Sequence, residues 1–285
     1  MNNFLSPKET AEAFDAVSVA KASHTTANLW ILGIFSGIFI AFGGFASATV
    51  SHTISNAGVA KLASGAVFPV GLMMVVMTGA ELFTGNNLMI IGYMDKKITL
   101  QQLLRNWVWV YLANFVGSLI VAFLVSQTGL FNSTGGALGA AVINTALSKV
   151  SLSFGQAFVR GILCNILVVV AVWMATASKD IVSKIFSCWF PIMMFVLSGY
   201  EHSIANMYFI PAGILAKANP VCVEAGNFAA EALAKLNVAG FLSNLIPVTL
   251  GNIVGGAVIV GISYWYVYRF APQQAEVKKS QTKAV

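Results

Sequence analysis

Long apolar runs separated by short polar connectors dominate the pattern of this chain. Six of them, near residues 28–50, 63–94, 107–128, 158–177, 185–216 and 241–268, are long enough to cross a bilayer, which takes roughly 20 helical residues. The runs are continuous rather than alternating, so they predict helices and not the strands of a membrane β-barrel. The pattern therefore predicts an all-α integral membrane protein with six transmembrane helices.

Polar residues interrupt two of the six runs. Residues 78–87 read TGAELFTGNN inside the second run, and residues 198–206 read SGYEHSIAN inside the fifth. An ionised group at the bilayer centre costs roughly 3 kcal/mol or more, so it is tolerated mainly where it faces a cavity or a partner. Both breaks share the order hydroxyl residue, Gly, any residue, Glu, which ends at Glu81 and Glu201. Two broken helices with the same polar signature predict one functional site where they meet.

An internal repeat relates the two halves of the chain. The third and sixth runs carry the same polar residues at the same spacing: Asn106, Asn114, Gly117 and Ser118, and then Asn244, Asn252, Gly255 and Gly256. A Phe-Pro pair also precedes each break, at 68–69 and at 190–191. Each half holds three helices, an odd number, so the second half must be inverted, as in many transporters with broken helices at the midplane. We therefore expect two inverted three-helix repeats in which helices 2 and 5 are broken.

Charge is scarce and unevenly distributed. The chain is 58% hydrophobic and 9% charged, against about 25% charged in a typical soluble domain. The net charge of +6 follows topology rather than a nucleic-acid partner, because eleven Lys and Arg fall on one side of the predicted spans and five on the other. The larger group is Lys8, Lys21, Lys96, Lys97, Arg105, Lys179, Lys184, Arg269, Lys278, Lys279 and Lys283. The positive-inside rule then places both termini in the cytoplasm, with membrane lipid as the surrounding partner and no nucleic acid.

The segments outside the spans divide the chain into three parts. Residues 1–27 are predicted to form a cytoplasmic amphipathic helix that begins with the capping box of Ser6 and Glu9 and has Ala11, Phe14, Val17 and Val19 on its apolar side. It is either a surface helix or a gating plug. Residues 28–269 form the transmembrane domain, and residues 270–285 form a cytoplasmic tail that is predicted to be disordered. No cleavable signal peptide is expected in residues 1–25, which are polar and partly acidic.

The outer connector from 128 to 156 carries a single charge, Lys149. This lysine is either a solvated loop residue or an electrostatic collector of anions at a pore mouth. The three cysteines are an odd number, with Cys164 and Cys188 in predicted spans and Cys222 in an outer loop, so no disulfide framework is implied.

The breaks carry the candidate chemistry. Glu81, Glu201 and Asn206 can satisfy backbone groups that a broken membrane helix leaves free, and the two glutamates are either structural or part of a proton relay. His202 stands where the first half has Leu82. A neutral histidine donates from one ring nitrogen and accepts at the other, and its reference pKa of about 6.5 lets it gain a proton in the physiological range. The hydroxyl of Thr84 can reach the same site. No second His or Cys pairs with His202 at a ligand spacing, so we expect no metal, no cofactor and no enzyme activity.

Three stretches resemble the formate/nitrite transporter family, pentameric bacterial channels for small monovalent anions. They are AELFTGNNL at 80–88, SGYEHSIANM at 198–207 and NLIPVTLGNIVGG at 244–256. The resemblance runs from the N-terminal helix to Tyr268. It implies an aquaporin-like six-helix protomer with its own pore, in a homopentamer of the bacterial inner membrane.

The resemblance also implies roles for single residues. His202 would be the central pore histidine, Thr84 its partner, Lys149 the lysine that draws anions inward, and Asn165 a polar residue on the pore side. Apolar constrictions above and below this site would reject hydrated ions, and the matching positions are Leu72, Leu82, Phe68, Phe83 and Phe195.

We therefore predict a channel that passes hydrosulfide, formate or nitrite passively. The first break, with Glu81 and the Gly85-Asn86-Asn87 sequence, favours the hydrosulfide branch of the family. The alternative on the same scaffold is a proton-coupled symporter of formate or nitrite. A membrane scaffold without transport would leave two polar breaks and a buried histidine without purpose.

Overall fold

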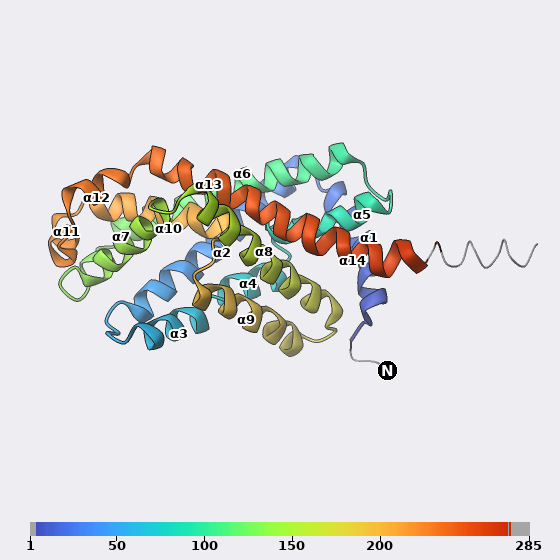
Figure 1. The fold of residues 1–285 in the computed structure, drawn as a ribbon, viewed down its shortest axis with the longest axis horizontal. Helices are drawn as coiled ribbons and strands as arrows, with labels where there is room; N and C mark the ends of the chain where they lie inside the picture. Colours follow the sequence, from blue (N-terminus) through green and yellow to red (C-terminus); the bar gives the residue numbers. More distant parts are fainter. Residues whose placement is uncertain (1–3, 273, 275–285) are drawn as a thin grey trace, which may run out of the picture.

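The computed structural model describes residues 4–272 and 274, which are helical throughout apart from short connections and one isolated bridge between Phe4 and Ser178. Six helices in this part are long and apolar enough to cross a membrane, which confirms the predicted all-α membrane fold. They lie along the longest axis of the molecule (Figure 1). They are α2 (Thr26–Ser51), α3 (Ala57–Val67) continued by α4 (Val70–Thr78), α6 (Leu100–Gln127), α8 (Phe154–Ala177), α9 (Ile181–Ser198), and α13 (Val238–Ile253) continued to Phe270.

The second and fifth spans are broken at the predicted positions. Helix α4 ends at Gly79 with φ 73°, and helix α9 ends at Gly199 with φ 71°. Glycine adopts this left-handed conformation without the steric cost that a side chain brings. Beyond the breaks the chain continues as η1 (Gly85–Met89) with α5 (Ile90–Met94), and as α10 (Ser203–Lys217). Both breaks therefore have the same backbone geometry at their start.

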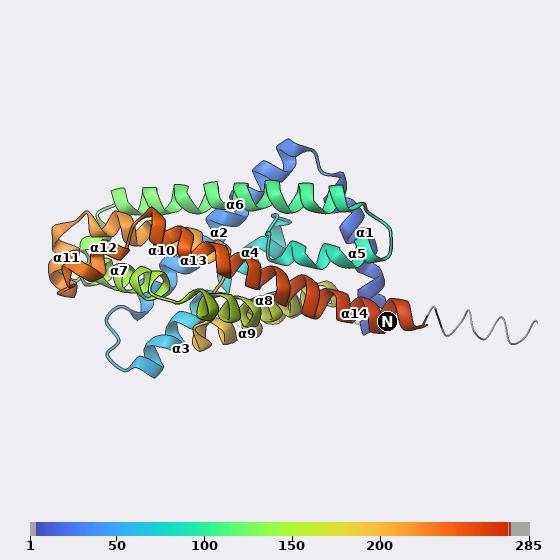
Figure 2. The ribbon, with the colours of Figure 1, turned by 45° about the horizontal axis from the view of Figure 1, so that its top comes forward.

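The inverted repeat is visible in two helix crossings at which a glycine packs directly against the backbone of the neighbouring helix. A Cβ atom at Gly117 of α6 would collide with the carbonyl oxygen of Ile34 on α2, and one at Gly255 would collide with that of Ile162 on α8. The pairs α2 with α6 and α8 with α13 thus pack in the same way. Figure 2 shows these long helices side by side.

Two further helices lie at opposite ends of the molecule. Helix α1 (Pro7–Ser23) lies at one end and α7 (Ala137–Val150) at the other (Figure 1). The connector over 128–156 contains α7, which occupies half of it and was not predicted. With 14 residues, α7 is too short to look like a span. We call the two ends of the molecule the α1 side and the α7 side.

Helix α1 starts as predicted. The Glu9 carboxylate accepts from the Ser6 backbone N–H at 2.7 Å, which closes the capping box. Ala11 and Phe14 are buried, but Val19 is 46% exposed, so its assignment to the apolar side is wrong. The buried stripe instead passes through Ser18, which packs against Gly92 on α5, a contact that only small residues permit.

The remaining elements complete the two ends. The short helices η2 (Leu130–Asn132), α11 (Pro220–Gly226) and α12 (Ala230–Lys235) lie on the α7 side, while η3 (Val254–Ile262), α14 (Ser263–Trp265) and η4 (Tyr266–Phe270) extend α13 toward the α1 side. Cys222 is buried in α11 rather than placed in a loop. The predicted disorder of 270–285 falls mostly outside the described residues, and 270–272 and 274 are helical.

Candidate functional site

The first break is held by a buried carboxylate. Glu81 is 2% exposed, and its Oε1 accepts from Lys21 Nζ of α1 at 2.6 Å. Its Oε2 accepts from Asn86 Nδ2 at 2.6 Å and from Asn106 Nδ2 at 3.3 Å. The same Asn106 amide lies 3.4 Å from the carbonyl oxygen of Lys21. The carboxylate is therefore paired with one cation and two amides.

The second break repeats this arrangement on the α7 side. Glu201 is 4% exposed, and its Oε1 accepts from Lys149 Nζ of α7 at 3.1 Å. Its Oε2 accepts from Asn206 Nδ2 at 2.6 Å and from Asn244 Nδ2 at 3.4 Å, while Asn244 Nδ2 also donates to the carbonyl of Lys149 at 2.9 Å. Helix α7 is thus the counterpart of α1, and each half of the repeat contains a further helix besides its three spans.

Lys149 differs from its predicted setting. It lies in the last turn of α7, not in a loop, and its side chain is 11% exposed. Besides Glu201 it faces the ring of Phe209, 5.2 Å from the centroid. The interpretation as a solvated loop lysine is wrong, because the ammonium is buried against a carboxylate.

The repeated asparagines fasten the broken backbone. Asn114 Nδ2 donates to the carbonyls of Gly33 and Glu81, each at 2.8 Å, and its Oδ1 accepts from the N–H of Phe83 at 3.0 Å. Asn252 makes the equivalent bonds to Gly161 at 2.8 Å, Glu201 at 3.0 Å and Ser203 at 2.9 Å. These carboxamides replace the helical partners that the breaks remove.

The sequence predicted that the glutamate side chains accept the freed backbone amides, but they do not. Their own N–H groups donate to carbonyls on the neighbouring long helices, Glu81 to Leu32 at 3.2 Å and Glu201 to Arg160 at 3.3 Å. Their side chains instead bind lysine and asparagine. Leu32 and Arg160 are therefore equivalent positions in the two halves.

His202 joins the two breaks. Its Nδ1 accepts from the backbone N–H of Ala205 at 3.1 Å and so caps the N-terminus of α10, and its Nε2 lies 2.8 Å from Thr84 Oγ1. A ring nitrogen that accepts carries no proton, so the neutral imidazole has its proton on Nε2 and donates it to Thr84. The Thr84 hydroxyl keeps its own proton free for another acceptor.

Asn165 holds the backbone next to this contact. Its Nδ2 lies 3.3 Å from the carbonyl oxygen of Thr84, 2.7 Å from Asn87 Oδ1 and 2.7 Å from the carbonyl oxygen of Asn252. Like Thr84, it lines neither of the two cavities described next, although His202 lines one of them. The structure thus brings Asn165 to the backbone of the break rather than to open space.

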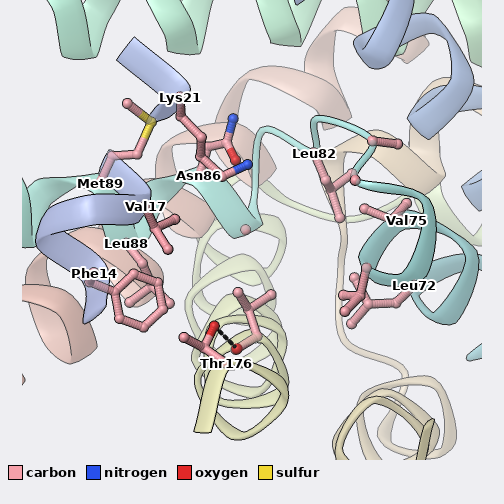
Figure 3. Close-up of a pocket in the computed structure, with 15 residues that line it drawn as sticks. Phe14, Val17, Lys21, Leu72, Val75, Leu82, Asn86, Leu88, Met89 and Thr176 are labelled. Atoms are coloured by element: carbon pink, nitrogen blue, oxygen red, sulfur yellow. Dashed lines mark hydrogen bonds between the residues drawn. The ribbon is translucent and has the colours of Figure 1, made fainter. Parts of the chain in front are cut away.

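A vestibule of about 150 Å³ lies on the α1 side of this contact. Figure 3 shows Leu72, Val75 and Leu82 on one wall and Phe14 with Val17 of α1 on the other. Two of the predicted constriction residues, Leu72 and Leu82, therefore line this cavity. The vestibule is mainly apolar, and α1 forms part of its wall instead of lying apart on the surface.

A second vestibule of about 310 Å³ lies on the α7 side. Phe68 and Phe195 line it, with ring centroids 5.5 Å apart, and Phe195 stacks on the His202 imidazole at 5.9 Å. His202 and Lys149 also line this cavity. Two more of the predicted constriction residues, Phe68 and Phe195, are thus brought together with His202.

Phe83 lies elsewhere. Its ring packs edge-on against Tyr111 at 4.9 Å and Trp107 at 6.1 Å, and it lines a separate apolar groove between α6 and α13. Leu82 and Phe83 are neighbours in non-helical backbone and point to different cavities. Their sequence could not show which of the two faces the vestibule.

An ionic cluster on the α1 side was missed by the sequence analysis. Arg269 at the end of the last span contacts Asp95 at 2.6 Å, Asp15 at 2.7 Å and Glu12 at 3.4 Å. Burial raises the pKa of Asp15 to about 6, helped by repulsion from Asp95 and opposed by Arg269. The cluster joins α1 to the end of the last span, and Arg269 and Asp15 are 254 positions apart in the sequence.

Comparison with known proteins adds the family. The model of the Formate/nitrite transporter family matches residues 8–266. The chain is 42% identical over 285 residues to a probable formate transporter of Methanothermobacter thermautotrophicus, covering 94% of this chain and 98% of that protein. It is 39% identical over 271 residues to the formate channel FocA of Escherichia coli (strain K12), covering 93% and 95%.

Solved structures agree with this comparison. A pentameric formate channel with formate bound superposes with a TM-score of 0.77 at 38% identity, covering 85% of this chain and 97% of that chain. An FNT family ion channel gives the same TM-score of 0.77 at 29% identity, covering 90% and 98%. These proteins are transporters and channels, not enzymes.

Proposed function

Because this chain belongs to the formate/nitrite transporter family, we propose that it is a channel that passes small monovalent anions, formate foremost, through a pore within each protomer. The observation that carries this proposal is the 2.8 Å contact between Thr84 and His202, which lies between two vestibules and joins the two broken helices. Formate is the anion named for the relatives. The assignment of this chain to the hydrosulfide branch of the family stays a prediction, which the uptake measurement below tests.

The proposed path runs from one vestibule to the other past this contact. On the α7 side an anion meets the rings of Phe68 and Phe195, and on the α1 side it meets Leu72 and Leu82. Apolar constrictions of this kind strip water from an ion, so they reject ions that keep their full hydration shell and admit small monovalent anions that can be dehydrated. Asn165 then acts by holding the Thr84 backbone and not as a lining group.

The centre of the path favours negative charge. The Thr84 hydroxyl has a free proton to donate, since its oxygen accepts from His202. The N-terminus of α10 begins at the His202 cap, and a helix N-terminus carries a partial positive charge of about half an elementary charge. Together these groups replace part of the hydration that the anion loses at the constrictions.

The capping role of His202 favours a channel over a proton symporter. A proton on Nδ1 would break the bond from the Ala205 N–H, which is a cap worth typically about 1 kcal/mol, and would place a charge in a site with 3% exposure. We therefore infer that His202 works as a neutral donor. Glu81 and Glu201 have a structural role in this account, because each already binds a lysine and two asparagines.

The surroundings of the pore follow from the family and the charge pattern. We infer that the chain assembles as a homopentamer in the bacterial cytoplasmic membrane, as the solved relative is pentameric. The α1 side carries most of the lysines and arginines and is the cytoplasmic side in this account, so both termini lie in the cytoplasm. The α7 side is then the outer side.

Anion flux into proteoliposomes tests this function. Formate, nitrite, hydrosulfide and chloride are compared between pH 5 and 8 in vesicles with purified protein and in empty vesicles. We expect rapid formate uptake, slower nitrite uptake and almost no chloride uptake. Uptake of hydrosulfide above formate would reassign the substrate within the same pore. No protein-dependent uptake of any of the four would reject the proposal.

A further inference from the structure

The two vestibules differ in charge. Three cationic side chains line the α7-side vestibule, Lys61 of α3, Lys149 of α7 and Arg160 of α8, together with one carboxylate, Glu201. In the α1-side vestibule Lys21 is the only charged lining residue among the described part of the chain. Since Lys21 and Lys149 are each paired with a buried glutamate, the charges that distinguish the two mouths are those of Lys61 and Arg160.

Neither of these two cations has a carboxylate partner in the part of the chain that the structure describes. In the described residues, the six ion pairs involve neither Lys61 nor Arg160. Both residues are exposed, and they reach this cavity from different helices, α3 and α8. The lining of this vestibule also includes six hydroxyl side chains: Ser47, Ser51, Ser64, Thr145, Ser148 and Tyr200.

Comparison of the two halves of the inverted repeat shows that the charge of Arg160 is present in the second half only. The backbone of Arg160 accepts from Glu201 at 3.3 Å, as the backbone of Leu32 accepts from Glu81 at 3.2 Å. The backbone role is thus shared, and a leucine is sufficient for it. The guanidinium of Arg160 is therefore not needed for this backbone contact, and it adds a positive charge to the α7-side mouth that Leu32 does not add to the α1-side mouth.

We propose that Lys61 and Arg160 form an anion-collecting site at the α7-side mouth, which gathers small monovalent anions ahead of the Thr84–His202 contact and has no equivalent at the α1-side mouth. The inference rests on the proposed function. Lys149, which the sequence analysis named as a collector, is largely neutralised by Glu201, so this role passes to the two unpaired cations.

The consequence is a sided dependence on salt. A cleft lined by one sign of charge raises local counter-ion concentration and capture rate by about 10- to 1,000-fold at low salt. Raising the ionic strength from about 0.01 M to about 0.15 M shortens the Debye length from roughly 30 Å to roughly 8 Å and removes most of this advantage. Capture from the α1 side has no unpaired vestibule charge to screen.

The test compares labelled formate uptake into right-side-out and inverted membrane vesicles that contain the full chain. At formate concentrations well below saturation, uptake into right-side-out vesicles is expected to fall about threefold or more when ionic strength rises with an impermeant salt. Uptake into inverted vesicles is expected to fall by less, because no unpaired cation lines the α1-side vestibule. The double variant Lys61→Gln, Arg160→Leu is expected to lose the low-salt advantage, while its uptake at saturating formate equals that of the parent chain.

Matched variants separate this site from general surface charge. Arg160→Lys keeps the charge and is expected to keep the salt response, and Lys235→Gln removes an exposed lysine of α12 that does not line the vestibule. An equal salt response on both faces, or an unchanged response in the double variant, overturns the collecting site while the channel stands. Absence of saturable uptake from either face overturns the channel itself.

Discussion

His202 touches Thr84 with one ring nitrogen, at 2.8 Å, while its other ring nitrogen caps helix α10. The two residues belong to opposite halves of the inverted repeat, since Thr84 follows Glu81 by three positions and His202 follows Glu201 by one. The contact therefore depends on both breaks being formed correctly. The bond from the Ala205 N–H to Nδ1 fixes which nitrogen of the imidazole holds the proton.

The first prediction concerns protonation at this site. In His202→Asn the side-chain oxygen can take the place of Nδ1 and cap α10, while the shorter amide does not reach Thr84 and cannot gain a proton, since asparagine does not titrate. We expect a folded protein whose formate flux keeps the pH profile of the parent chain. Proteoliposome uptake at intervals between pH 5 and 8 checks this.

The control for this variant is His202→Phe, which removes both the cap and the donor and is expected to lose most of the flux at every pH. A His202→Asn protein that loses proton-coupled uptake selectively would favour the symporter instead.

The second prediction concerns the buried ion pairs. Lys149→Gln leaves Glu201 buried without its cation, and breaking such a pair costs about 3–5 kcal/mol. Lys21→Gln is expected to cost less, because the Lys21 side chain is 24% exposed against 11% for Lys149. Thermal unfolding in detergent, followed by loss of the monodisperse elution peak, gives the order.

The double variant Lys149→Gln, Glu201→Gln is the test of cause. It is expected to be more stable than Lys149→Gln alone, since no lone charge remains. Equal stabilities of these two proteins would contradict the account.

Much of the architecture could be predicted from the sequence because its causes are local or periodic. Run length fixes the six spans, and Gly79 and Gly199 mark the ends of α4 and α9. The equal spacing of Asn106 with Asn114 and Asn244 with Asn252 exposes the repeat, since both asparagines of each helix clamp one break.

The remainder could not be predicted because it depends on contacts between distant segments. Lys149 pairs with a glutamate 52 positions away, and Arg269 joins Asp15 at the other end of the chain. The equivalence of α1 and α7 was not predicted, because α1 precedes the first span and α7 lies within the connector between the third and fourth spans. The side chain of Phe83 turns away from the vestibule because non-helical backbone gives no periodicity from which to assign a face.

The third prediction concerns the helix crossings. Gly117→Ala and Gly255→Ala place a Cβ atom against a backbone carbonyl, of Ile34 and Ile162 respectively, which cannot move aside as a flexible side chain would. Overpacking of this kind costs about 1–3 kcal/mol. Both variants are expected to lower the thermal stability, and by similar amounts because the crossings are equivalent.

Gly155→Ala is the matched control. Its Cβ would meet nothing within 4 Å in the first turn of α8, and alanine is favoured over glycine in a helix by up to about 1 kcal/mol. It should be neutral or stabilising. A loss of stability equal to that of the crossing variants would show that the close approach is not the cause.

The fourth prediction concerns pH and the docking of α1. Burial and Asp95 raise the pKa of Asp15 to about 6 from an ordinary value of 3.8. The docked helix therefore holds the proton more tightly than the free helix does, so docking is strongest below the ordinary value and weakens as the pH rises to about 6. Hydrogen exchange of residues 7–23 is expected to quicken between pH 5 and 7 beyond its intrinsic pH dependence.

Asp15→Asn is expected to abolish this excess, because an amide stays neutral at every pH in the range. Glu9→Gln is the control on the same helix, since the pKa of Glu9 is lowered by its bonds to Ser6 and it does not titrate in this interval. An excess that persists in Asp15→Asn would assign the effect to another group.

The measurement that tests the central claim most directly is formate flux in Thr84→Val beside Thr84→Ser, with electrical recording in planar bilayers. Valine keeps the shape of threonine but removes the hydroxyl that donates to the anion, and a hydrogen bond to a charged group is worth about 1.5–3 kcal/mol. We expect flux to fall about tenfold or more in Thr84→Val, to persist in Thr84→Ser, and to appear as anion current in the parent chain. Unchanged flux in Thr84→Val would contradict the claim that anions pass the Thr84–His202 contact.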